Sequence, residues 1–121
     1  MARARIGDEQ GGDAVRSARA GASDRETVAV AVRYLLQLLA ERAPGNTVEV
    51  RVPPFGAVQA IDGPRHTRGT PPNVIEMDAA TWLALATGSR DWASAVRDGA
   101  VSASGSRADL AGQLPILGMR E

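Results

Sequence analysis

The sequence predicts an α+β domain in which helices pack on one face of a mostly antiparallel sheet of about five strands. Three observations predict this class. A long segment with apolar residues at helical spacing comes first, a region with strand alternation and turn signals follows, and short segments bounded by caps and glycines come last. A chain of 121 residues is long enough for one hydrophobic core, so we expect one domain.

Residues 1–22 are expected to form an ill-ordered N-terminal arm. Glycines interrupt the segment repeatedly, and few apolar side chains could anchor it. The alternative is a turn or two of helix that starts at Asp13 and passes through Val15 and Ala18. We place the domain itself over residues 23–118.

A long helix is predicted from Asp24 to about Arg42. Ser23 and Glu26 have the spacing of a capping box, and the Leu-rich continuation favours a helix over a strand. Polar residues occupy only a narrow stripe, so we expect the helix to be covered on more than one side. Either it is deeply buried or in a dimer contact, or part of it walls an apolar cavity.

Strands are predicted downstream of this helix. Residues 47–52 alternate valines with polar residues, and residues 55–61 form a second, antiparallel strand after a Pro-Pro turn. Asp62-Gly63 is a hairpin signal, after which residues 64–72 could pair as a third strand, confined to an edge by its prolines. Residues 73–77 form the fourth strand.

Caps and glycines define the C-terminal elements. Asp78 is expected to cap a helix that stops at Gly88, and Ser89 or Asp91 caps a shorter one. A fifth strand with small side chains follows at residues 101–104. The last predicted helix is started by Ser106 and Asp109 and directs Leu110, Ala111 and Leu114 inward.

The composition excludes several functions. The charges of 14 basic and 14 acidic residues cancel, which argues against a nucleic-acid surface. There is no cysteine and only one histidine, so we expect neither a metal nor another cofactor, and no catalytic residue. No apolar run is long enough to span a membrane and no signal sequence is evident, so we expect a cytoplasmic protein without integral membrane association.

Several motifs resemble a known family. Leu85-Ala86-Thr87-Gly88, Trp92 with Ala95, Asp98-Gly99-Ala100-Val101, and Ser104-Gly105-Ser106 before Leu110 resemble the C-terminal half of sterol carrier protein domains. The stretches VEVRVPPFGAVQ and GPRHTRGTPPNV are similar to the small bacterial sterol-carrier orthologue group of high-GC bacteria. The resemblance covers about residues 23–117. It implies a sterol-carrier-like single domain with an apolar space between the sheet and its helices.

The function that this resemblance implies is non-enzymatic binding of a hydrophobic small molecule, of lipid or fatty-acyl type. Arg65, His66 and Arg68 are the candidates for a polar mouth, because they form the only polar cluster suited to recognition. The apolar candidates line the pocket or form the core around it, which sequence cannot separate. They are Val28, Val32, Leu35, Leu36, Leu39, Trp82, Leu85, Trp92, Val96 and Leu110.

Two other hypotheses stay open. The first is a protein-interaction or homodimerisation module with a filled core, which uses the polar segment 64–72 as a contact. The second is a small-anion-handling enzyme, or a subunit of one, that uses the loop of Arg65, His66 and Arg68. No nucleophile motif or orienting acid accompanies His66.

Overall fold

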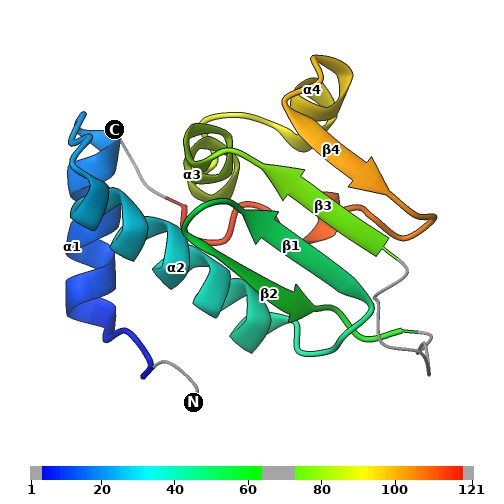
Figure 1. The fold of residues 1–121 in the computed structure, drawn as a ribbon, viewed down its shortest axis with the longest axis horizontal. Coiled ribbons are helices and arrows are strands. Elements are labelled where there is room, and N and C mark those ends of the chain that lie inside the picture. The colour runs from blue at the N-terminus through cyan, green and yellow to red at the C-terminus, as the bar shows by residue number, and fades with distance from the viewer. Residues whose placement is uncertain (1–3, 64–72, 119–121) are drawn as a thin grey trace.

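A computed structural model describes residues 4–63 and 73–118 of the protein (Figure 1). Helices and strands alternate in blocks rather than one by one, as expected for an α+β domain. The elements are α1 (Asp8–Arg19), α2 (Arg25–Arg42), β1 (Val48–Val52), β2 (Gly56–Ala60), β3 (Asn73–Met77), α3 (Ala79–Thr87), α4 (Trp92–Arg97), β4 (Val101–Ser104) and the 3-10 turn η1 (Ala111–Gln113).

The residues that the structure describes form a four-stranded mixed sheet in the order β2-β1-β3-β4. β1 pairs antiparallel with β2 and β3 pairs antiparallel with β4, but β1 and β3 are parallel. The α+β class and the mostly antiparallel pairing are therefore confirmed, but the central β1–β3 pair differs from the expectation because it is parallel. β3 buries Asn73, Ile75 and Met77, so it occupies an inner position beside β1 instead of extending the β1–β2 hairpin. The strand predicted at 64–72 lies outside the described residues.

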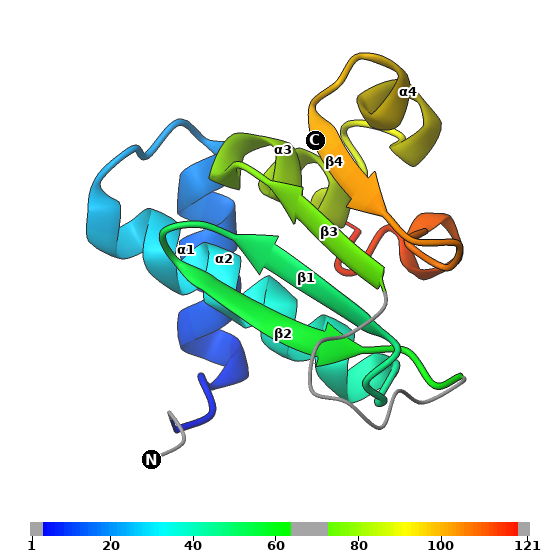
Figure 2. The same cartoon turned by 45° about the vertical axis from the view of Figure 1, so that its right-hand side comes forward.

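α2 and α3 lie against the same face of the sheet (Figure 2). Val48, Val50 and Val52 of β1 point to these helices and are fully buried, as their alternation predicts. α2 begins one residue later than the capping-box prediction, because the Asp24 carboxylate, not Ser23, accepts the backbone N–H of Thr27 at 3.0 Å. The core lies between these helices and the sheet.

The N-terminal arm is a helix over most of its length, so the expected lack of order is wrong for residues 8–19. α1 crosses α2 and covers Tyr34, which leaves that side chain only 4% exposed (Figure 1). Val15 of α1 is fully buried in the same core. α1 thus supplies the second cover that the broad apolar surface of α2 requires.

Gly11 is the residue that permits this crossing. A Cβ atom built at Gly11 would stand 2.2 Å from the ring of Tyr34, far inside van der Waals contact. The glycine therefore lets the α1 backbone approach the aromatic ring directly, although glycine is an unfavourable helix residue. A sequence pattern shows the unfavourable propensity but not the partner that compensates for it.

Gly11→Ala is therefore expected to lower the free energy of unfolding by about 1–3 kcal/mol, through overpacking against Tyr34. Gly12→Ala is the matched control, because its Cβ would meet only the flexible guanidinium of Arg16, at 3.4 Å. Alanine at this second site should be neutral or stabilising by up to about 1 kcal/mol. Urea unfolding of the two variants measures both effects, and equal stability of the two would contradict this packing.

The C-terminal segment differs from its prediction as well. In place of a helix after Ser106, the structure has the single turn η1, because the Asp109 carboxylate accepts the N–H of Ala111, only two residues on. Beyond this turn, Ile116 and Leu117 both donate their N–H groups to the carbonyl of Ala86, at 2.8 and 3.0 Å. These two hydrogen bonds hold the end of the described chain against α3.

Candidate functional site

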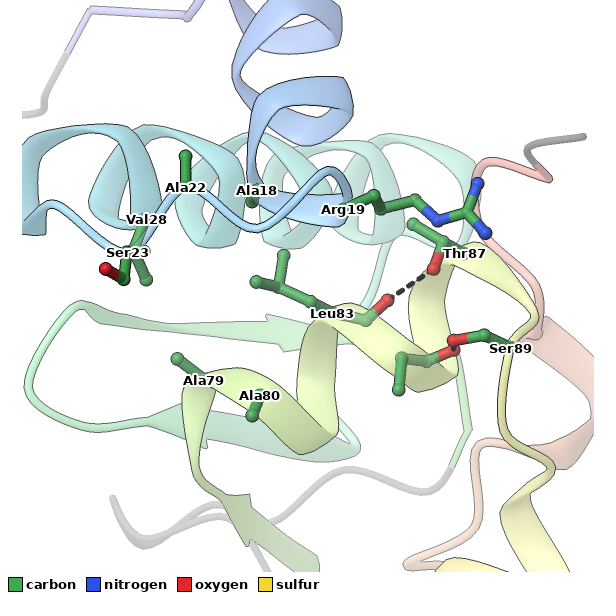
Figure 3. Close-up of a pocket in the computed structure, with 11 residues that line it drawn as sticks. Ala18, Arg19, Ala22, Ser23, Val28, Ala79, Ala80, Leu83, Thr87 and Ser89 are labelled. Carbon is green, nitrogen blue, oxygen red and sulfur yellow. Dashed lines mark hydrogen bonds between the residues drawn. The ribbon is translucent and has the colours of Figure 1, made fainter. Parts of the chain in front are cut away.

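An open groove of about 590 Å³ lies between the end of α1, the start of α2 and the length of α3 (Figure 3). We call it the α1–α3 groove. Its walls are mainly small apolar side chains: Ala18, Ala22, Val28, Ala79, Ala80, Leu83 and Ala84. Most of these are half-buried, so they remain in contact with water. A volume of this size lies in the range typical of small-molecule sites.

Polar groups lie at the rim of the groove. Arg19 extends from α1 toward the end where Thr87 and Ser89 lie, and Ser23 stands beside Val28 at the other end (Figure 3). The Thr87 hydroxyl donates to the carbonyl of Leu83 at 2.6 Å, which fixes its direction. The groove therefore has one end with a cation and hydroxyls and a floor that is apolar.

α3 presents two faces because of its start and stop signals. The Asp78 carboxylate accepts the N–H of Thr81 at 2.8 Å, and this hydrogen bond lowers the pKa of Asp78. Gly88 ends the helix in the left-handed conformation, with φ at 89°. Both boundaries were predicted. Between them, Ala79, Leu83 and Thr87 recur every four residues and face the groove, while the opposite side is buried in the core.

The start of α1 is held on α2 by a polar cluster. The Tyr34 hydroxyl donates to Asp8 at 2.8 Å, and Arg5 donates to Asp8 at 3.2 Å and to Glu41 at 2.6 Å. These donors lower the pKa of Asp8, and the Arg5 guanidinium likewise lowers the pKa of Glu41. Burial, reinforced by the Asp8 charge, raises the pKa of Tyr34. The main chain of Ile6 exchanges two hydrogen bonds of 2.8 Å with the Gln37 amide.

Most of the predicted apolar lining residues form the core itself. Their side chains are at most 2% exposed and fill the space between sheet and helices, where the sequence predicted an apolar space. These residues are Val32, Leu35, Leu36, Leu39, Trp82, Leu85 and Leu110. The α1–α3 groove lies instead between helices. Val28 is the one residue of the predicted set that lines it.

Two predicted lining residues lie on α4. Trp92 is half-buried and lines a separate concavity of about 350 Å³ with Leu114 and Pro115. Val96 is 40% exposed, so its expected place on an inward face is wrong. α4 has only six residues, and Ala95 is its one buried residue. The side chain of the neighbouring Val96 therefore faces water.

The predicted polar mouth of Arg65, His66 and Arg68 lies outside the described residues. The cationic side chain that does line the groove is Arg19. The sequence prediction missed it because Arg19 belongs to the arm that was expected to be ill-ordered. The spacing of Val15 and Ala18 by three residues is the signal that could have placed this arm on a helix face.

Within residues 4–63 and 73–118, no group of three or more histidine and carboxylate side chains lies close enough to hold a metal ion. None of the helices in the described part of the chain is long and apolar enough to cross a membrane.

Comparison with known proteins was made at two levels. No curated protein matches the chain. A protein-family model described as bacterial SCP ortholog, where SCP stands for sterol carrier protein, matches residues 24–116. The matched region contains α2, α3, α4 and the four strands of the described residues, whereas α1 precedes it. Because this match covers most of the 121 residues, the protein belongs to the bacterial sterol carrier protein ortholog family.

Proposed function

We propose that the protein binds a hydrophobic small molecule of lipid type in the α1–α3 groove, without catalysing a reaction. The observation that carries this proposal is a groove of about 590 Å³ with apolar walls in a domain whose core is already filled. Its half-exposed alanine, valine and leucine side chains lose contact with water when an apolar chain lies on them, at about 25 cal/mol for each Å² buried. Membership of the family supports a carrier role.

The groove is a better candidate than the space between sheet and helices. A ligand in that space would have to displace side chains such as Leu35, Leu39 and Ile75, which are fully buried. The loss of close packing would cost several kcal/mol for each large side chain displaced. The groove needs no such displacement, because its walls already face solvent.

Ala80→Trp is expected to weaken the binding of a fluorescent fatty acid by at least about tenfold, because the indole fills the groove. Ala80 is exposed on α3, so the domain tolerates the larger side chain. The matched control is Ala93→Trp, which introduces the same indole at an exposed position on α4, beside the concavity of Trp92.

Fluorescence titration of both variants and of the unchanged protein measures the effect. The control should bind like the unchanged protein. Loss of binding in Ala93→Trp with full binding in Ala80→Trp would move the site to the concavity beside Trp92. Absence of uptake by the unchanged protein, together with a mass in native spectrometry that matches the bare chain, would overturn the carrier function.

A second candidate function is an interaction module that binds a partner protein or its own copy. The observation that favours it is the filled core between the sheet and helices. Light scattering coupled to gel filtration tests whether the protein associates with its own copy. This function predicts the mass of a dimer and no binding of an apolar ligand. The enzyme hypothesis depends on Arg65, His66 and Arg68, which the described residues do not include, and it stays a hypothesis.

A further inference from the structure

α1 completes the groove although it lies outside the region that matches the family. The matched region begins at residue 24, and α1 ends at Arg19. Ala18, Arg19 and Ala22, from the end of α1 and the turn after it, form one wall opposite α3 (Figure 3). Without this wall, α3 would face the groove with no partner on that side. The N-terminal segment is therefore part of the site that it borders.

The position of this wall is fixed at a distance from the groove. Gly11 rests on the ring of Tyr34, and Val15 is fully buried against the domain core. Before them in the chain, the Asp8 carboxylate accepts a hydrogen bond from the Tyr34 hydroxyl. The main chain of Ile6 forms two hydrogen bonds with the side-chain amide of Gln37. Because a helix is stiff over 12 residues, these contacts also place its last turn, where Arg19 lies.

Charge distinguishes the two ends of the groove. Among the described residues that line it, Arg19 is the only charged one, and none is acidic. Arg19 is half-buried and extends toward the end with the Thr87 and Ser89 hydroxyls, whereas Val28 and Ala79 lie toward the other end (Figure 3). A guanidinium has five N–H donors, so it can serve a ligand in addition to contacts within the protein. The arrangement fits a molecule with one anionic head and one apolar chain.

We propose that Arg19 makes the groove selective for a single-chain amphiphile with a carboxylate head over a neutral amphiphile of the same length. This inference rests on the proposed function, because it assigns a head-group contact within the same groove. The carboxylate lies at the Arg19 end, where the planar guanidinium can donate two parallel hydrogen bonds to it. The alkyl chain runs along the apolar floor toward Val28.

The test compares dodecanoate with dodecanol as competitors of a fluorescent fatty-acid probe at neutral pH, with the acid below its micelle concentration and the alcohol below its solubility limit. The unchanged protein should bind the acid about five- to tenfold more tightly than the alcohol, the range expected for one partly solvated charge-assisted contact. Arg19→Gln should remove this preference and leave the affinity for dodecanol unchanged, because the apolar floor is intact. The salt dependence of acid binding should fall in the same variant.

Arg16→Gln is the matched control. Arg16 is also on α1, is exposed, pairs with Asp13 and does not line the groove. It should keep the acid preference in full, which separates a contact at the groove from a change in net charge. Equal affinities of the unchanged protein for acid and alcohol, or a preference that survives Arg19→Gln, would overturn the role of Arg19 and leave the proposed function standing. Failure of both ligands to bind would overturn both.

Discussion

Trp82→Ala is expected to lower the free energy of unfolding by about 3–5 kcal/mol, the cost typical of deleting a buried tryptophan. Trp82 is fully buried and heads the large side chains of the core. It extends from α3 to α2, where its indole N–H donates to the carbonyl of Val32 at 3.2 Å. Its removal leaves a cavity between α2 and α3.

Trp92→Ala is the control for this prediction, because Trp92 is half-buried on α4 and packs at the edge of the core. Its loss should cost about half as much, in proportion to the smaller area removed from water. Urea unfolding with a constant m value measures both. Equal losses would mean that Trp82 does not join α3 to α2. Trp82→Phe separates the indole hydrogen bond, at about 1 kcal/mol, from the packing.

Asn73→Ala is the second large effect, with an expected loss of about 2–4 kcal/mol. The Asn73 side chain is 3% exposed, donates to the carbonyl of Thr47 at 2.9 Å and accepts the N–H of Arg107 at 2.8 Å. It thus joins the start of β3 to the residue that precedes β1 and to the segment before η1. Deletion of the side chain removes both hydrogen bonds. Each main-chain group that loses its partner near the core costs about 1–3 kcal/mol of stability.

Asn46→Ala provides the control, since Asn46 lies exposed in the turn before β1. A surface substitution of this kind should change stability by less than about 0.5 kcal/mol. Hydrogen exchange adds a second measurement, because the Arg107 amide should lose protection in Asn73→Ala. An Arg107 amide that exchanges at the same rate in both variants would contradict the bridge.

The elements with local signals were predictable. Caps and stops are set by neighbouring residues, so Asp78 and Gly88 define α3 where the sequence places it, and Asp91, one of two candidates, caps α4. The alternation of Val48 to Val52 likewise reports a strand with one buried face. These features need no knowledge of the rest of the fold.

The elements that depend on distant partners were not predictable. Gly11 and Gly12 lower the intrinsic tendency to form a helix, and α1 forms because it packs on distant partners such as Tyr34 of α2. The parallel pairing of β1 with β3 depends on which edge of β1 the returning chain reaches. Local alternation is the same for either edge.

The candidate site belongs to this second group. Its walls come from α1, α2 and α3. α1 and α3 contribute half-buried alanines such as Ala18, Ala79 and Ala84, and no local pattern assigns these small side chains to a site. The leucine-rich pattern of α2 favoured a site in the space between the sheet and its helices, but the leucine side chains fill that space. Val28 at the first turns of α2 is the one predicted residue that lines the groove.

The location of a bound amphiphile tests the account most directly. Amide chemical shifts of the labelled protein, followed during titration with dodecanoate, report which residues the ligand contacts. We expect saturable shifts of the amides along the groove and unchanged shifts beside Trp92 and Leu114; the groove amides are those of Ala18, Ala22, Val28, Leu83 and Ala84. Shifts that saturate around Trp92 and Leu114, or none along the α1–α3 groove at saturating ligand, would contradict it.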